Sequence, residues 1–229
     1  MLFRSQVRIF NPDGSEASLS GNGTRCAAAY LYYKKLWTAE ELRLSTRAGV
    51  KLYTLQEDDG HGRYLFDSEL GQPKFDASSI PMLAEYPLDK IVDHRLALDD
   101  RYVRITALQI GNPVCCIFVN NFDSLDWREI GRRIETHERF PERTNVVFVR
   151  VVDRNTIELR IWERGVGETQ ASGTCSCAAA VASMFKGETE RLITVLMPGG
   201  TAKIQWRPDN EVVITGTAEV VYEGDWLAE

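Results

Sequence analysis

One repeated pattern constrains the fold of this 229-residue chain more than any other feature of its sequence. A short strand, a glycine-rich turn and an alanine-rich helix occur twice, about 150 residues apart. The first copy begins at Ser20 as SGNGTRCAAA, and the second begins at Ser172 as SGTCSCAAA, one residue shorter. Such self-similarity indicates an internal duplication, and alanine is the strongest helix former. We therefore expect two similar lobes.

Strand patterns outnumber helix patterns along the chain. Alternation of apolar and polar residues predicts half-buried strands at residues 7–10, 51–55 and 156–162. Helical patterns are confined to residues 26–36, 127–138 and 177–186, and two of these carry an alanine triplet. The sequence therefore predicts an α+β protein.

The chain is predicted to cross from one lobe to the other at two points. Gly71, Pro73 and the polar residues 76–79 indicate a crossover near residue 68. The last strand, from Val212, is expected to return to the first lobe. We therefore assign residues 1–67 with 212–229 to an N-terminal lobe and residues 68–211 to a C-terminal lobe.

Composition favours a soluble protein that handles small molecules. A net charge of −6 with interspersed charges argues against a nucleic-acid partner, which requires a basic face. Apolar runs are too short for a signal peptide or a membrane span, so we expect no membrane contact and a cytoplasmic location. The five cysteines are odd in number, lie in apolar or Ala-rich surroundings and lack zinc-site spacing. They therefore predict reduced, buried thiols and no metal.

The duplicated helix starts suggest a chemistry. A helix N-terminus offers unpaired backbone N–H groups and partial positive charge, which bind a carboxylate. Two such termini aimed at one point would hold the α-carboxylate of an amino acid and stabilise the charge that forms when its α-proton leaves. Proton removal on one face and donation on the other then inverts the carbon without a cofactor. The alternative is that each serine only caps a helix after a tight turn.

Two long signatures carry a family resemblance. Residues 10–16 followed by 20–26, and residues 163–174, resemble the two signatures of the diaminopimelate epimerase family, with Ser20 and Ser172 where the family has its catalytic cysteines. Four shorter segments also match, namely Gly111-Asn112-Pro113, Arg143-Thr144-Asn145-Val146, Pro198-Gly199-Gly200-Thr201 and Ile214-Thr215-Gly216-Thr217-Ala218. The resemblance runs from Arg8 to about Glu223.

The resemblance implies a fold and an activity. Each lobe would be a mixed or antiparallel sheet wrapped around a central helix. The activity would be the conversion of LL-diaminopimelate to the meso form, in lysine and peptidoglycan precursor synthesis, by two-base proton transfer without a cofactor. Ser20 and Ser172 would occupy the catalytic positions.

The resemblance also assigns the binding residues. The distal, non-reacting end of the substrate would be held by Asn11, Asn112, Asn145 and Arg164, since a guanidinium fork suits a carboxylate. Glu163 would contact the α-ammonium, and the backbone of Gly21, Asn22, Gly173 and Thr174 would hold the α-carboxylate. Two alternatives stay open: Asn112 simply opens a turn before Pro113, and Glu163 and Arg164 form a solvated pair.

Three departures from the family pattern bear on activity. Cysteine titrates near ~8.5, lower at a helix N-terminus, whereas serine needs a strong neighbouring base. The family's histidine after Pro113 is Val114 here. The chain also starts just before the first signature, which predicts an incomplete first lobe with open strand edges that would pair with a second copy as a homodimer. A catalytically inactive amino-acid-binding homologue and another amino-acid isomerase on the same fold therefore remain alternatives.

Overall fold

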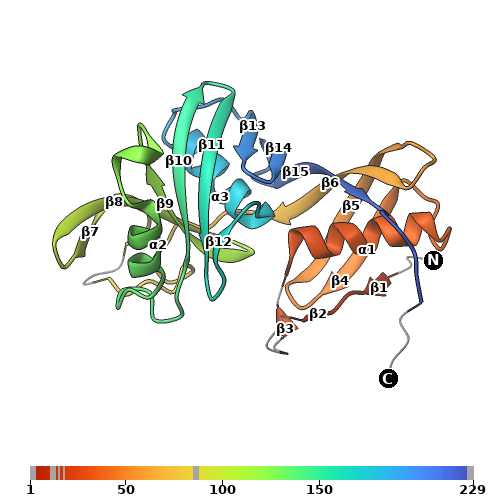
Figure 1. Ribbon diagram of the computed structural model, residues 1–229, viewed down its shortest axis with the longest axis horizontal. Coiled ribbons are helices and arrows are strands. Elements are labelled where there is room, and N and C mark those ends of the chain that lie inside the picture. The colour runs from red at the N-terminus through yellow and green to blue at the C-terminus, as the bar shows by residue number, and fades with distance from the viewer. Residues whose placement is uncertain (1–3, 11–13, 15, 18, 85–87, 226–229) are drawn as a thin grey trace. The chain divides into compact units, whose positions relative to one another are not determined.

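A computed structural model describes residues 4–10, 14, 16–17, 19–84 and 88–225, with the backbone alone at Arg4 and Ala17 (Figure 1). The chain divides into two compact units, residues 1–69 with 215–229 and residues 70–214. Strands dominate both units and helices are few, so the predicted α+β class is confirmed. The chain passes from one unit to the other within β6 (Arg63–Gly71) and again within β15 (Val212–Glu219).

In the first unit a helix packs on a sheet, and a small separate hairpin lies near the start of the described residues. Its strand order is β1 (Arg4–Gln6), β4 (Glu41–Thr46), β5 (Gly49–Asp58), β6 and β15, and α1 (Gly21–Tyr33) packs on this sheet. β1 pairs with β4 in parallel, whereas the β4–β5 and β5–β6 pairs are antiparallel. Ala28, Ala29 and Tyr32 on one face of α1 pack with Leu42 and Phe66 from the sheet. This face of α1 and the sheet residues that it contacts form the core cluster of the unit.

The strand predicted at residues 7–10 is wrong in part. β1 ends at Gln6, and a separate strand, β2 (Ile9–Phe10), pairs with β3 (Glu16–Ala17) as a small hairpin. β1 pairs with β4, and this pairing extends one residue past β1, because the Val7 N–H donates to the Ser45 carbonyl oxygen at 2.9 Å. The two segments therefore have different partners, and local alternation cannot reveal which strand each of them pairs with.

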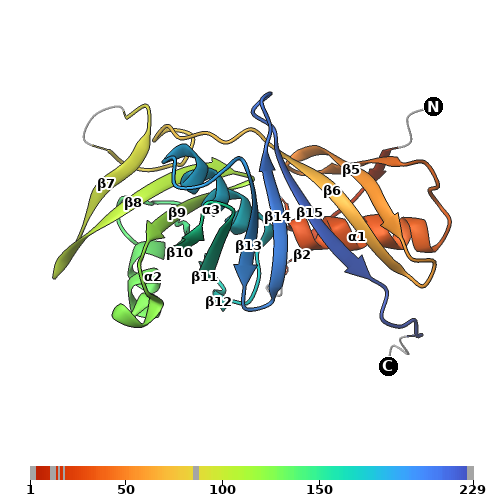
Figure 2. The same cartoon turned by 90° about the horizontal axis from the view of Figure 1, so that it is seen from above.

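The second unit is a mixed sheet with helices on both faces. Its order is β14 (Gly200–Trp206), β13 (Leu192–Met197), β11 (Thr156–Glu163), β10 (Asn145–Asp153), β9 (Asn112–Phe118), β8 (Arg101–Ile110) and β7 (Ile91–Leu98), and β12 (Gly167–Thr169) pairs only with β11. β9 and β10 are parallel, as are β11 and β13, while the other pairs are antiparallel. Figure 2 shows α3 (Gly173–Phe185) and α2 (Trp127–Glu135) on opposite sides of β10 and β11.

Successive side chains of the central strands pack alternately into two hydrophobic cores. On β10, Val147 and Val149 pack in the cluster around α3, whereas Val146 and Phe148 pack in the cluster around α2. Successive side chains of a strand point to opposite faces, so a strand covered on both sides is apolar throughout. The central strands of the second unit are therefore fixed in register by two cores at once.

The three predicted helices are present, but their ends differ. α1 begins at Gly21 and α3 at Gly173, several residues before the predicted starts. Both glycines have low helix propensity, yet the serine before each one has extended dihedral angles and acts as the N-cap. A short 3-10 helix, η1 (Phe122–Ser124), precedes α2, which ends at Glu135 rather than residue 138. No helix in the described part of the chain is long and apolar enough to cross a membrane.

Candidate active site

Ser20 stands at the N-terminus of α1 in the first unit. Its backbone is extended, with φ −132° and ψ 115°, and its Oγ accepts a hydrogen bond from the Gly23 N–H at 3.1 Å. Its carbonyl oxygen accepts from both the N–H and the hydroxyl of Thr24, at 2.9 and 2.8 Å. Thr24 in turn hydrogen-bonds the Tyr53 hydroxyl from the sheet. The residue predicted to transfer a proton is thus tied to the core of the unit by Thr24.

Arg25 holds the side chain of Asn22, two residues after Ser20. Its Nη2 donates to Asn22 Oδ1 at 2.8 Å, and its Nε donates to the Thr217 carbonyl oxygen at 2.9 Å. A Cβ added at Gly216 would lie 3.2 Å from the guanidinium, so glycine leaves the space that Arg25 occupies. The C-terminal segment that matched the family therefore supports the first helix start.

Ser172 takes the equivalent place at the N-terminus of α3 in the second unit. Its φ of −148° and ψ of 123° repeat those of Ser20, and its carbonyl oxygen accepts from the N–H and the hydroxyl of Ser176, at 3.0 and 2.7 Å. Both helices have 13 residues, so Thr24 corresponds to Ser176 without a gap. The apparent one-residue difference between the copies is therefore only an offset of their alanine triplets. The Ser172 hydroxyl, unlike that of Ser20, caps no backbone N–H.

A buried thiol lies beside the second serine. Cys175 has no exposed surface, and burial raises the pKa of its thiol. The negative charge of Glu163 raises that pKa further, and hydrogen bonds with the hydroxyls of Ser172 and Thr174 offset part of the rise. A thiol held in its neutral form has little nucleophilic or basic character. Its complete burial therefore argues against Cys175 as a replacement for the cysteine that the family resemblance places at position 172.

The predicted distal-end residues of the second unit share one edge of its sheet. Asn112 and Asn145 begin the parallel neighbours β9 and β10, and Glu163 ends β11, which runs antiparallel to β10. Asn112 Nδ2 donates to Thr174 Oγ1 at 3.4 Å, which joins this edge to the first turn of α3. The structure thus brings together residues that lie about 60 positions apart in the sequence.

A tight turn carries Arg164 at this edge. The Arg164 N–H donates to Asn145 Oδ1 and the Arg164 Nη1 donates to the Glu142 carbonyl oxygen, each at 2.8 Å. The next residue, Gly165, has a φ of +74°, which glycine adopts without a steric penalty. Glu163 Oε1 accepts from Thr169 Oγ1 at 2.8 Å. Among the described residues, Glu163 and Arg164 therefore bond other groups of the second unit rather than each other.

The two asparagines offer opposite chemistry to a ligand. Asn145 uses its amide oxygen on the Arg164 backbone, which leaves its NH2 group to donate. Asn112 uses its NH2 group on Thr174, which leaves its amide oxygen to accept. With the guanidinium of Arg164, this edge has donors for a carboxylate and an acceptor for an ammonium group. That set suits the distal end of a diamino dicarboxylate.

The remaining predictions have different outcomes. Ser20, Gly21 and Asn22 belong to the first unit, and the other predicted site residues belong to the second, except Asn11, which lies outside the described residues. Val114, where the resemblance implies histidine, is fully buried in the core around α3. Cys26 is exposed, so the prediction that all five thiols are buried is wrong for this one. Cys26 is the sixth residue after Ser20 and lies on the outer face of α1.

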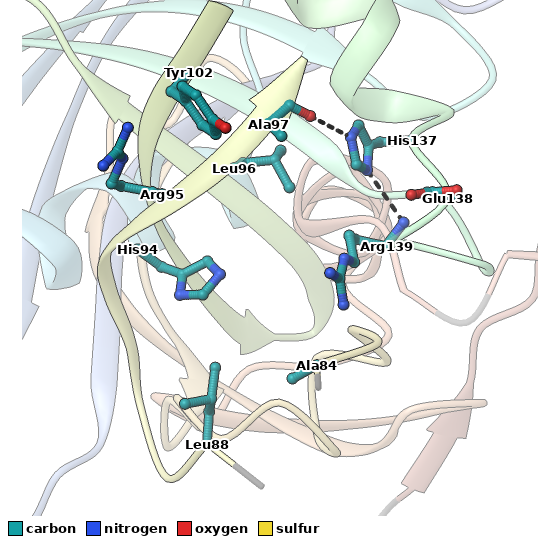
Figure 3. A pocket seen from close by; sticks show the side chains of 10 residues that line it. All are labelled: Ala84, Leu88, His94, Arg95, Leu96, Ala97, Tyr102, His137, Glu138 and Arg139. Atoms are coloured by element: carbon teal, nitrogen blue, oxygen red, sulfur yellow. Dashed lines mark hydrogen bonds between the residues drawn. The ribbon is translucent and has the colours of Figure 1, made fainter. Parts of the chain in front are cut away.

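One pocket of the second unit is lined in part by two histidines and by none of the predicted site residues. Figure 3 shows a pocket of about 350 Å³ in the second unit, lined in part by His94 and His137 and containing none of the predicted residues. His137 is held by the Ala97 carbonyl oxygen at 2.8 Å and by the Arg139 N–H at 3.1 Å. Among the described residues, no group of three or more His, Cys, Asp or Glu is placed to hold a metal ion.

Comparison with known proteins supports the resemblance. The sequence pattern of the family described as diaminopimelate epimerase matches residues 4–75 and 106–221. A diaminopimelate epimerase from Pelotomaculum thermopropionicum is 42% identical over 220 residues, covering 96% of this chain and 78% of that protein. One from Azotobacter vinelandii is also 42% identical over 220 residues, covering 96% of this chain and 77% of that protein. The similarity therefore spans nearly the whole sequence.

Solved structures show the same fold at much lower identity. A hydroxyproline epimerase from Agrobacterium vitis has a TM-score of 0.68 at 14% identity, covering 93% of this chain and 67% of that one. A PhzF-family phenazine biosynthesis protein from Bacillus anthracis has a TM-score of 0.63 at 16% identity, covering 95% of this chain and 80% of that one. These likenesses establish the architecture and no more.

Proposed function

Since the chain belongs to the diaminopimelate epimerase family, we propose that it binds LL-diaminopimelate and inverts one α-carbon, without a cofactor, to give the meso form. The observation that carries the proposal is the grouping of Asn112, Asn145, Glu163 and Arg164 at one sheet edge beside the first turn of α3. A substrate with a second charged end uses such a group. A plain amino acid has no need of it.

The reacting end is assigned to the two helix N-termini. The N–H groups of Gly21 and Asn22, and those of Gly173 and Thr174, lie in the first turns of their helices, where they have no partner within the helix. They would hold the α-carboxylate and stabilise the negative charge that develops as the α-proton leaves. Glu163 would take the α-ammonium by its carboxylate.

Proton transfer is assigned to Ser20 and Ser172. A serine hydroxyl must lose its own proton to become a base, and it does this poorly without a strong neighbouring base. Within the described residues, no histidine or carboxylate hydrogen-bonds either hydroxyl, and that of Ser20 accepts from Gly23. We therefore expect slow inversion, far below that of a variant with thiols at both positions.

The same observation favours a second candidate function, an amino-acid-binding protein that does not turn over its ligand. This candidate keeps the distal-end contacts and the carboxylate cradle and lacks a base. The two candidates agree on binding of diaminopimelate and differ only in exchange of its α-proton.

Exchange in deuterated water separates the candidates. LL-diaminopimelate is incubated with the native chain and with the Ser20→Cys/Ser172→Cys variant, and loss of the α-proton signal is followed by NMR. We expect slow exchange with the native chain and a rise of about 10²-fold or more with the double variant, which is within the range of general acid–base catalysis. Binding is measured in parallel by calorimetry.

The control is the Ser78→Cys/Ser124→Cys variant, which adds two thiols at exposed positions and should leave exchange at the native rate. Saturable binding with no exchange by the native chain would establish the second candidate. Absence of binding by the native chain would contradict both. Equal rates for the native chain and the Ser20→Cys/Ser172→Cys variant would show that these serines do not occupy the base positions.

A further inference from the structure

A buried carboxylate stands where helix electrostatics disfavours it. Glu135 is the last residue of α2 and only 6% of its surface is exposed. The C-terminal end of a helix carries partial negative charge, so an anionic side chain there is destabilising. Burial adds a desolvation cost unless the carboxylate is well hydrogen-bonded. A side chain that violates two local preferences requires a compensating set of contacts.

Those contacts all come from the segments that carry the distal-end residues. Glu135 Oε1 accepts from the Gly165 N–H, and Glu135 Oε2 accepts from Trp162 Nε1, each at 2.8 Å. Trp162 and Gly165 immediately flank Glu163 and Arg164. The Glu135 carbonyl oxygen accepts from the Thr144 N–H at 3.4 Å, next to Asn145. One residue therefore binds both sides of the turn and the start of β10.

Glycine allows α2 to come close enough for these bonds. Gly131 lies one helical turn before Glu135, on the same face of α2. A Cβ added at Gly131 would meet Trp162 Cβ at 3.0 Å and Trp162 Cγ at 3.1 Å. The helix backbone thus packs directly on the tryptophan whose indole N–H binds Glu135. α2 and the turn form one close-packed unit.

A cation completes the environment of the carboxylate. Arg143 Nη1 lies 3.6 Å from Glu135 Oε1, and the Arg143 side chain is 56% exposed while that of Glu135 is 8% exposed. The ion pair is therefore open to solvent on one side and weak. The two short hydrogen bonds from the turn, rather than this pair, account for where the carboxylate lies.

We propose that Glu135 is a positioning residue for recognition of the distal end of the substrate. Its carboxylate holds the turn of residues 162–165, so that the Arg164 guanidinium and the Asn145 amide donate to one carboxylate of the ligand. The identity of that ligand, a diamino dicarboxylate, rests on the proposed function. The positioning of the turn itself does not.

Replacement by the isosteric amide tests the role of the two oxygens. Glu135→Gln keeps the shape but has one oxygen and one NH2 group, so a donor must face either the Gly165 N–H or the Trp162 indole N–H. The matched control is Glu129→Gln on the same helix, where the carboxylate is exposed and bonds only Arg132 among the described residues. Both changes remove one negative charge from α2.

Two measurements are made on each variant. Amide hydrogen exchange at Arg164 and Gly165 reports the turn without any ligand, and we expect it to rise about tenfold or more in Glu135→Gln and to stay native in the control. Calorimetry compares diaminopimelate with lysine, which lacks the distal carboxylate. We expect Glu135→Gln to weaken diaminopimelate binding about tenfold and lysine binding by less than about twofold.

The outcomes are distinct. Native amide exchange in Glu135→Gln, or equal weakening of both ligands, would overturn the proposal. If the native chain binds neither ligand, the proposed function fails, and the exchange data still decide whether Glu135 positions the turn. Should Glu135→Gln not fold, Glu135→Asp keeps the charge, shortens its reach by one methylene and is expected to change both readouts in the same direction.

Discussion

The two helix N-termini differ in their surroundings far more than in their own geometry. Ser20 and Ser172 share extended dihedral angles, and Thr24 and Ser176 bind the carbonyl oxygens of these serines in the same way. α1, however, buries one face on a single sheet, whereas 11 of the 13 residues of α3 are buried. The two copies have therefore kept the hydrogen bonds to the serine carbonyl oxygen, although not the side-chain cap, while they are packed to different depths.

This difference separates the part of each copy that local hydrogen bonds determine from the part that packing determines. The geometry of the helix start depends on the serine, the glycine after it and a hydroxyl four residues on, and both copies have these. The helix bodies depend on their surroundings. Alanine, serine and cysteine suit α3 because strands surround it, whereas α1 tolerates Cys26 and Tyr30 on its outer side.

The largest expected difference between the copies is in thiol reactivity. Cys26 on α1 is exposed, whereas Cys175 on α3 is fully buried and burial raises the pKa of its thiol, as it also does for Cys115 and Cys116. At neutral pH we expect Cys26 to react with a thiol reagent at least about 10³-fold faster than these three, because they must wait for unfolding. Mass spectrometry of labelled peptides measures each rate. Fast labelling of Cys175 would contradict the packing of α3.

A charge placed at equivalent positions should separate the copies in stability. Ala178 is the sixth residue after Ser172, as Cys26 is after Ser20, and Ala178 has no exposed surface. Ala178→Glu buries an unpaired carboxylate in a close-packed core, so we expect a loss of about 4 kcal/mol or more in the free energy of unfolding. Cys26→Glu should stay within about 0.5 kcal/mol. Denaturant titrations compare the two, and equal losses would break the comparison.

Much of this architecture follows from sequence, and the exceptions have physical reasons. The duplication and both serines at the helix N-termini were predictable, because glycine turns and alanine helices are local signals. The helix starts at Gly21 and Gly173 were not, since glycine has a low helix propensity, which the Ser20 side-chain cap offsets in α1 and no side-chain cap offsets in α3. The break after Gln6 depends on which strand each segment pairs with.

The site shows the same division. The resemblance named Asn112, Asn145, Glu163 and Arg164, and the register of β9, β10 and β11 groups them at one edge. Glu135 was missed because its partners, a backbone N–H and an indole about 30 residues later, leave no periodic pattern. A carboxylate at a helix C-terminus was the signal that could have identified it.

The smallest expected difference is in capping. Ser20 Oγ accepts from the Gly23 N–H, whereas the Ser172 hydroxyl caps no backbone N–H. Ser20→Ala should therefore lower the free energy of unfolding by about 1 kcal/mol, and Ser172→Ala by only a few tenths of that amount. Matched denaturant titrations of the two variants measure the difference. A larger loss for Ser172→Ala would show that its hydroxyl has a stabilising partner that the capping geometry does not include.

The central proposal, that the chain binds diaminopimelate through its helix N-termini, is tested most directly by NMR titration of the native chain with diaminopimelate. The amide resonances of Gly21 and Gly173 report the starts of α1 and α3 separately. If both helix starts take part in binding, the two amides shift along a single saturation curve with the same midpoint. A shift at only one glycine, or two curves with different midpoints, would contradict the account.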